Sequence, residues 1–242
     1  LEGMTDIDEK DIEYAKKLNC KIKLVARSKY ESGEVSGFIR PALVDNNNML
    51  SKIDNEFNVV ILVGDSVGEL SFVGKGAGRG ATGSAVYADI IDIIDNNKEK
   101  RNIEIVGILV NNLEKHKDKK YSNIITNNID DIFNKDIDIL VEVMGGLEPS
   151  LSYIKKALNN KIHVVTANKD LLAECGDELA KLASENKVSI KFEASVAGGI
   201  PVLKPIIESL EGNNIDSINA ILNGTTNFIL SKMYDENLSY DM

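Results

Sequence analysis

Four clusters of glycines and polar residues in the middle of the chain have the residue types that ligand binding and proton transfer require. They are Glu142–Gly146 (EVMGG), Thr166–Lys169 (TANK), Glu193–Gly199 (EASVAGG) and Asn223–Asn227 (NGTTN). Lysine and glutamate can exchange protons, and a glycine pair lets a flat ligand approach the backbone because no Cβ intervenes. An ordinary strand-to-helix turn would explain any one of them. Four in succession favour a small polar ligand bound beside a lysine.

Each cluster follows a short apolar run rich in β-branched residues, and three of the four lead into a helical stretch. The runs begin near Ile137, Lys161, Ser189 and Ile218. This alternation is typical of βαβ units and a parallel sheet. Ligands of such sheets bind at the carboxyl ends of the strands, where these clusters lie.

A glycine-rich segment, GKGAGRGATG, occupies residues 74–83 and contains the spacing Gly78-x-Gly80-x-x-Gly83. It lies between a predicted strand and a predicted helix at residues 84–96. In a dinucleotide-binding fold such glycines make the tight turn, and the helix N-terminus faces the pyrophosphate. A plain glycine-rich connection is the alternative. Gly78, Gly80 and Gly83 are therefore candidate cofactor-binding residues.

The elements outside these clusters are predicted from their periodicity and turn signals. A helix starts after the capping pattern at residues 5–8 and runs to about residue 18, and antiparallel strands follow at residues 21–28, 34–44, 57–63 and 68–73. Further along the chain we expect a strand at residues 102–110 and helices at residues 149–159, 201–211 and 227–234.

Composition limits the class of protein. The 242 residues are 43% hydrophobic, with no run of eighteen apolar residues, which favours one large or two modest globular domains and argues against a membrane partner. The net charge of −10 argues against nucleic acid, whose phosphates it would repel. Two cysteines are too few for a disulfide framework, so a reducing cytoplasm is the expected compartment.

The segments VEVMGG, HVVTANKDLLAE, FEASVAGGIP and NGTTNFIL, in this order and spacing, resemble the homoserine dehydrogenase family. Residues 64–90, GDSVGELSFVGKGAGRGATGSAVYADI, resemble a carboxyl-terminal catalytic-region segment of the same family. In the family that segment follows the NGTTN region, whereas here it precedes the nucleotide-binding half. The chain is therefore permuted or joined from two pieces. The first glycine-rich loop of the family and the acidic segment that holds homoserine are not matched.

The resemblance implies an α/β fold with a Rossmann-like parallel sheet and an α+β substrate and dimerisation domain. It divides the chain into residues 1–83 (substrate and dimerisation), 84–170 (nucleotide binding) and 171–242 (catalytic). The implied activity is the NAD(P)-dependent interconversion of L-homoserine and L-aspartate 4-semialdehyde in threonine and methionine biosynthesis. The implied assembly is a homodimer.

The resemblance also assigns roles to residues. Lys169 matches the catalytic lysine of the family, which guides a proton during hydride transfer. The cofactor would contact Met144, Gly145, Gly146, Thr166, Asn168 and Lys169, in addition to the three glycines above. The substrate would contact Glu193, Asn223, Gly224 and Thr225. A sodium ion would be held by Glu193 and by the backbone carbonyls of Val196, Gly198 and Ile200.

Two questions stay open at this stage. Asn111 and Asn112 follow the strand at the position where an acidic residue would favour NAD, and four lysines (Lys115, Lys117, Lys119 and Lys120) come next, which favours NADP. A solvated loop would explain the same lysines. The second question is activity, because the unmatched acidic segment also fits a catalytically incomplete permuted fragment that acts only in nucleotide binding or dimerisation. Thioester chemistry at Cys175 is less favoured, since this residue falls inside a predicted helix.

Overall fold

The chain forms two compact units in a computed structural model, which describes residues 3–4, 6–97 and 103–239. Unit 1 comprises Leu1–Ala85 and Glu193–Met242, and unit 2 comprises Val86–Phe192. The predicted segment 171–242 is thus divided between the units. Its first part stays with unit 2 because residues 190–191 pair with the strand at residues 163–166. Within the described residues, no helix is long and apolar enough to cross a bilayer.

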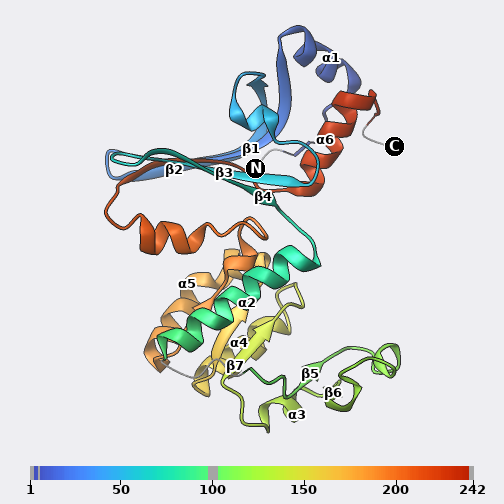
Figure 1. Ribbon diagram of the computed structural model, residues 1–242, viewed down its shortest axis with the longest axis vertical. Coiled ribbons are helices and arrows are strands. Elements are labelled where there is room, and N and C mark those ends of the chain that lie inside the picture. Colours follow the sequence, from blue (N-terminus) through green and yellow to red (C-terminus); the bar gives the residue numbers. More distant parts are fainter. Residues whose placement is uncertain (1–2, 5, 98–102, 240–242) are drawn as a thin grey trace. The chain divides into compact units, whose positions relative to one another are not determined.

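Unit 1 is built on a five-stranded antiparallel sheet with the order β2-β1-β10-β3-β4. Its strands are β1 (Cys20–Glu31), β2 (Glu34–Asp45), β3 (Phe57–Gly64), β4 (Gly68–Lys75) and β10 (Ile215–Ile221). Its helices are α1 (Glu9–Lys17), the 3-10 turns η1 (Met49–Lys52) and η4 (Glu193–Ser195), the π-helical turn η5 (Pro205–Ser209) and α6 (Gly224–Glu236). In Figure 1, α1 and α6 lie at the same end of this sheet.

Local sequence accounts for the first hairpin and the first helix. Ser32 and Gly33 both have positive φ, 55° and 87°, as a two-residue hairpin turn requires, so β1 and β2 pair in continuous register. The Asp8 carboxylate accepts the N–H of Lys10 and of Asp11, and Asp11 reciprocates, which starts α1 at Glu9. Residue 5 of the predicted capping pattern lies outside the described residues.

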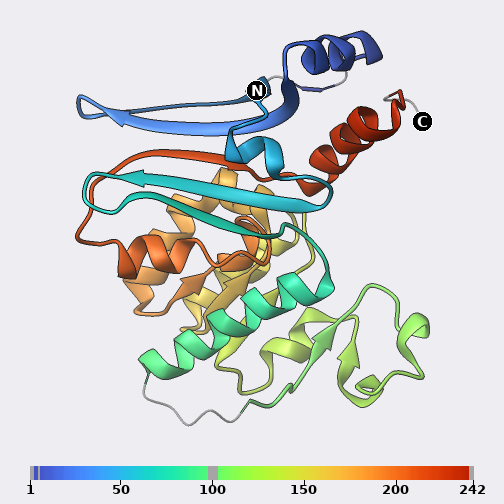
Figure 2. The same cartoon turned by 45° about the horizontal axis from the view of Figure 1, so that its top comes forward.

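Strand β10 corrects a prediction. Its sequence was expected to belong to the parallel sheet, but β10 pairs antiparallel with β1 and β3 (Figure 2). Because β10 lies in the centre of the sheet, apolar side chains are buried on both of its faces. Ile221 packs with Val59 in one hydrophobic cluster, and Ala220 packs with Val60 in another. A strand buried on both faces has the continuous apolar run that parallel strands show, so sequence alone does not separate them.

Unit 2 contains the parallel strands. They form a three-stranded sheet of β7 (Ile139–Glu142), β8 (His163–Thr166) and β9 (Ile190–Lys191), and a pair of β5 (Ile108–Leu109) and β6 (Ile125–Thr126). The helices are α3 (Ile129–Phe133), α4 (Ser150–Asn159), α5 (Lys169–Asn186) and the 3-10 turns η2 (Glu114–His116) and η3 (Ser122–Ile124). Helix α2 (Arg79–Asn96) leads from unit 1 into unit 2. The parallel α/β architecture predicted for this half is confirmed.

Apart from β10 and the start of α2, three predicted elements differ from the structure. The strand expected at residues 102–110 is regular only at Ile108–Leu109, and residue 102 lies outside the described residues. The helix expected at residues 201–211 is shorter: residues 203–204 are helical and lead into the π-helical turn η5, which ends at Ser209. The helix expected from Asn227 begins at Gly224, since Asn223 caps it.

The core of unit 2 packs α4 and α5 against the three-stranded sheet. Ile154 and Leu158 of α4, Val164 of β8, and Leu171 and Leu179 of α5 are fully buried together. In β7 and β8, Glu142 lies opposite Thr166, so the last residues of the two strands are neighbours. The carboxyl ends of β7 and β8 therefore meet at one edge of the sheet, as the sequence predicted.

We expect Leu179→Ala to lower the free energy of unfolding of unit 2 by about 2–5 kcal/mol, because it leaves a cavity under α5. Urea unfolding followed by circular dichroism, with amide hydrogen exchange of β8 as the local report, measures the change. Lys181→Ala, an exposed change on the same helix, is the control and should alter stability by less than about 0.5 kcal/mol. Equal stability of the two variants would contradict the core assignment.

Candidate functional site

Glu142, the last residue of β7, organises the turn that follows it. Its side chain is only 4% exposed. Oε1 accepts hydrogen bonds from the N–H of Met144 at 2.7 Å and of Gly145 at 3.3 Å, and from the Ser150 hydroxyl at 3.2 Å. Oε2 accepts the Thr166 hydroxyl at 2.6 Å. These donors replace the water that a buried carboxylate loses, and they fix the EVMGG turn between β7 and β8.

Gly145 and Gly146 present bare backbone at this turn. Both have positive φ, 80° and 75°, a conformation that L side chains rarely adopt. A Cβ built on either glycine meets no heavy atom within 4 Å, so the space beside them is open. The Asn168 amide donates to the Gly146 carbonyl at 2.7 Å and holds the turn against the next loop. This arrangement suits the flat face or ribose of a nucleotide.

The TANK segment continues the same edge from β8 into α5. Thr166 is buried, and its Oγ1 accepts the N–H of Asn168 at 3.1 Å. Asn168 caps α5, its Oδ1 accepting the N–H of Leu171 at 3.2 Å. Lys169 is the first residue of the helix and is exposed. A cationic side chain thus stands at a helix N-terminus, where the helix dipole favours an anionic ligand.

The structure brings together all six predicted cofactor contacts of unit 2. Residues 144–146 follow β7, residues 166–169 run from the end of β8 to the start of α5, and the side chains of Glu142 and Asn168 join the two segments. The sequence analysis included Glu142 in the EVMGG cluster but not among the cofactor contacts, and it did not name Ser150. The signal for Glu142 was a carboxylate at the end of an apolar strand, whereas nothing in the sequence marked Ser150.

The glycines Gly78, Gly80 and Gly83 lie in unit 1, at the start of α2. The helix begins at Arg79, five residues earlier than predicted, and Gly78 immediately before it has φ of 115°. A Cβ built on Gly78, Gly80 or Gly83 meets nothing within 4 Å. The first turn of α2 is therefore unobstructed, as a phosphate-binding helix N-terminus must be.

The glycines of EASVAGG have a packing role that the sequence did not reveal. Gly198 has φ of 68°, and a Cβ there would lie 2.1 Å from the Gly76 carbonyl oxygen. A Cβ on Gly199 would lie 2.6 Å from the Cβ of Ala81, and the Gly199 N–H donates to the Lys75 carbonyl at 3.2 Å. Two glycine segments distant in the sequence are thus in backbone contact within unit 1.

Glu193 holds the backbone that follows it. The side chain is 7% exposed, and its Oε1 accepts the N–H of Val202 at 2.6 Å and of Leu203 at 2.8 Å, while Oε2 accepts that of Lys204 at 3.0 Å. Among the described residues, no group of three or more His, Cys, Asp or Glu side chains could hold a metal ion. The sodium site of Glu193, Val196, Gly198 and Ile200 would depend mainly on backbone carbonyls and stays a prediction.

The NGTTN segment forms the start of α6. Asn223 is the N-cap, its Oδ1 accepting the N–H of Thr226 at 3.0 Å. Gly224 packs against the loop before β3, where a Cβ on this residue would lie 3.1 Å from the Glu56 carbonyl oxygen. Asn227 is buried inside unit 1. Residues 223–226 are thus at least partly exposed, whereas Asn227 is not.

Three further residues have surroundings that the structure defines. His163 lies in β8, where its Nδ1 accepts the Ser189 N–H at 3.0 Å and burial lowers the pKa of the imidazole. Cys175 is a free thiol within α5, away from any strand end. Lys117, one of the candidate 2′-phosphate ligands, forms an ion pair with Glu114.

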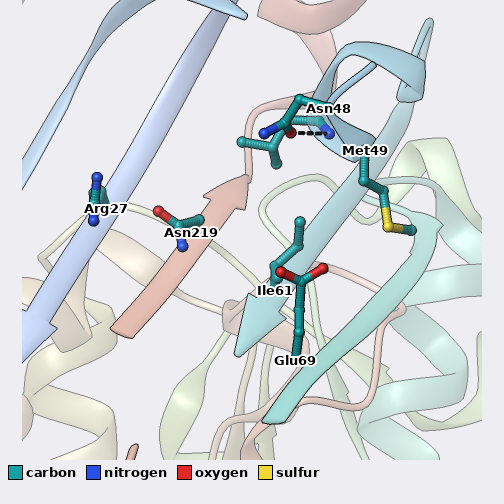
Figure 3. Close-up of a pocket in the computed structure, with 7 residues that line it drawn as sticks. Arg27, Asn48, Met49, Ile61, Glu69 and Asn219 are labelled. Carbon is teal, nitrogen blue, oxygen red and sulfur yellow. Dashed lines mark hydrogen bonds between the residues drawn. The ribbon is translucent and has the colours of Figure 1, made fainter. Parts of the chain in front are cut away.

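A separate pocket of about 230 Å³ lies on unit 1. Its wall includes Arg27, Asn48, Met49, Ile61, Glu69 and Asn219, which project from the sheet and from η1 (Figure 3). None of the predicted site residues lines it.

Comparison with known proteins identifies the family. The homoserine dehydrogenase family model matches residues 1–91 and 201–242, together more than half of the chain. The model described as the NAD binding domain of homoserine dehydrogenase matches residues 78–193, so residues 78–91 are matched by both. An interrupted match of this kind agrees with the predicted rearrangement of segments, which itself stays a prediction.

Individual relatives give the same family. A homoserine dehydrogenase of Bacillus subtilis is 42% identical over 168 residues, and one of Synechocystis is 40% identical over 166 residues. Each alignment covers 68% of this chain but only 39% and 38% of the relative. A crystal structure of a homoserine dehydrogenase from Thiobacillus denitrificans matches with a TM-score of 0.54 and 36% identity, covering 67% of this chain and 37% of that one.

We expect Glu142→Gln to weaken NADPH binding by about tenfold, because an amide nitrogen would face one of the donors and leave it unpaired at a cost of about 1–3 kcal/mol. Fluorescence titration with NADPH measures the affinity. Glu174→Gln on the exposed side of α5 is the matched control and should bind as the unchanged chain does. Unaltered affinity in Glu142→Gln would show that the turn does not contact the nucleotide.

Proposed function

Because the chain belongs to the homoserine dehydrogenase family, we propose that it catalyses the NAD(P)-dependent interconversion of L-homoserine and L-aspartate 4-semialdehyde. This reaction is a step of threonine and methionine biosynthesis. The observation that carries the proposal is the site of unit 2, where the open Gly145–Gly146 turn and the start of α5 meet beside Lys169. The matched part of the chain spans about two fifths of the length of the curated relatives.

The residues of unit 2 fit a nicotinamide dinucleotide. When bound, the cofactor accepts or supplies the hydride. The chain contributes the two bare peptide units at Gly145 and Gly146, held in place by Glu142 and Asn168, and a helix N-terminus for negative charge. The lysines at residues 115–120 lead us to propose NADP over NAD. The ratio of the KM for NAD to the KM for NADP measures this preference.

Lys169 is the proposed proton-transfer residue. Oxidation of an alcohol to an aldehyde releases the hydroxyl proton, so a basic group must stand within hydrogen-bond reach of that oxygen. Lys169 is the candidate because it is the first residue of α5, directly after the Asn168 cap, and its side chain is exposed. Thr166 and Asn168 fix the backbone from which it projects.

The substrate carboxylate is proposed to bind at the start of α6. The first N–H groups of a helix have no partner inside the helix, and the dipole favours an anion there. Asn223, Gly224 and Thr225 occupy this position, and α6 continues for 13 residues. Glu193 is proposed to act on substrate binding by holding the backbone of residues 202–204.

The proposed assembly is a homodimer in the cytoplasm. Strand β2 is an edge of the unit 1 sheet, and Val35, Ile39 and Leu43 on one of its faces are 73%, 40% and 55% exposed. An exposed apolar edge strand is a template for a second strand. The free thiols of Cys20 and Cys175 fit a reducing compartment.

We expect Lys169→Ala to lower kcat for homoserine-dependent reduction of NADP or NAD by about 10²-fold to 10⁴-fold, the usual contribution of a general acid–base group. Lys181→Ala on the same helix is the control and should retain activity. If the folded chain binds NADPH but has no turnover, the proposed activity falls and nucleotide binding alone is left.

Light scattering is expected to give twice the 26.5 kDa of one chain. Val35→Lys combined with Ile39→Lys should shift the mass to that of a monomer, because two charges would be buried at the edge. The pair Val73→Lys and Tyr87→Lys, exposed positions away from β2, serves as the control. A monomeric unchanged chain would refute the dimer.

A further inference from the structure

Lys23 is a buried cation that the proposed chemistry does not use. It lies in β1, and its side chain is 1% exposed. An ammonium group is costly to bury unless its donors are satisfied and its charge is paired. Burial accordingly lowers the pKa of Lys23, while the Asp54 carboxylate beside it acts in the opposite direction. The burial of this ammonium group therefore indicates a structural or functional role for Lys23.

The contacts of Lys23 account for its three donors. Nζ donates to the Ile53 carbonyl at 2.5 Å, to Asp54 Oδ1 at 2.9 Å and to Asn227 Oδ1 at 3.0 Å. Asp54 is shared with Lys21, whose Nζ lies 2.8 Å from Oδ2. The ammonium thus joins the loop before β3 to the first turn of α6, which are far apart in the sequence.

Asn227 extends this connection through its amide. Nδ2 lies within 3.0–3.1 Å of the carbonyl oxygens of Ile53, Asn55 and Phe57, so the amide spans the loop from one end to the other. The amide can point its nitrogen at the loop only if its oxygen has another donor, and Lys23 is that donor. The orientation of Asn227 therefore depends on the ammonium.

The same loop seats the start of α6. Gly224 lies against the Glu56 backbone, and the Asn58 amide donates to the Leu222 carbonyl at 2.9 Å, just before the Asn223 cap. Lower in the helix, the Ser231 hydroxyl donates to the Asn227 carbonyl and accepts the Asn55 N–H at 3.0 Å. Residues 53–58 form the loop against which the start of α6 packs, and the Lys23 ammonium donates hydrogen bonds to both the loop and the helix.

We propose that Lys23 is a positioning residue for the substrate-binding end of α6: through Asn227 it fixes the direction in which the N–H groups of Gly224 and Thr225 point. The inference deepens the proposed function and rests on it, because the ligand at those groups is taken to be the homoserine carboxylate. Lys23 itself does not contact the substrate.

The test compares Lys23→Met with the unchanged chain. Methionine keeps the length of the side chain but removes the donors, and Asp54 retains Lys21 as its partner. Lys29→Met is the matched control, since Lys29 lies on the same strand and pairs with Glu31 at the surface. Calorimetry measures L-homoserine affinity, fluorescence titration measures NADPH affinity, and amide hydrogen exchange reports on residues 223–231.

We expect Lys23→Met to weaken L-homoserine binding by about tenfold or more, the effect of misdirecting charge-assisted hydrogen bonds, with NADPH affinity unchanged. Exchange at residues 223–231 should accelerate while the centre of β3 stays protected. Lys29→Met should change neither. If Lys23→Met does not fold, Asp54→Asn weakens the same ammonium contact from a partly exposed position and should act in the same direction.

Homoserine affinity within twofold of the unchanged chain, or a parallel loss of homoserine and NADPH affinity, would overturn the positioning role. Failure of the proposed function gives a different pattern, in which the unchanged chain does not bind L-homoserine at all. The exchange measurement then decides: selective acceleration at residues 223–231 in Lys23→Met supports the positioning role, and unchanged exchange refutes it.

Discussion

The buried carboxylate of Glu142 is the interaction on which the nucleotide half depends. A carboxylate that loses its water must find donors, and here these come from the turn after β7, from α4 and from the end of β8. Satisfying one charge therefore fixes three segments at once. The open glycine turn and the capped start of α5 keep their geometry because both are attached to this group, directly or through Asn168.

Unit 1 also contains a buried charged side chain with hydrogen-bond partners, but there the charge is positive. Lys23 is buried beneath the start of α6, and its donors hold a loop and a helix that come from opposite ends of the chain. The glycine contacts at Gly76 and Gly198 make a second such junction through bare backbone. In both units a potential ligand-binding helix start is exposed, while the polar group that orients it is buried.

The order of segments along the chain has little bearing on these contacts. Strand β10 lies between β1 and β3, so the sheet of unit 1 joins residues from both ends of the sequence. Residues 1–91 and 201–242 match one family model although the nucleotide-binding match stands between them. Side-chain and backbone complementarity, which does not depend on the order of connection, can hold such segments together wherever short connections permit.

The sequence alone determined the family, the presence of a parallel α/β half, and the meeting of the EVMGG and TANK segments, since these follow from short motifs, local periodicity and turn chemistry. Tertiary structure decided what is non-local. It placed β10 in an antiparallel sheet, because a strand buried on both faces has the same apolar pattern in either kind of sheet. It also gave Glu142, Lys23 and Gly198 their partners, which lie far away in the sequence or depend on how the chain turns, so no short motif could reveal them.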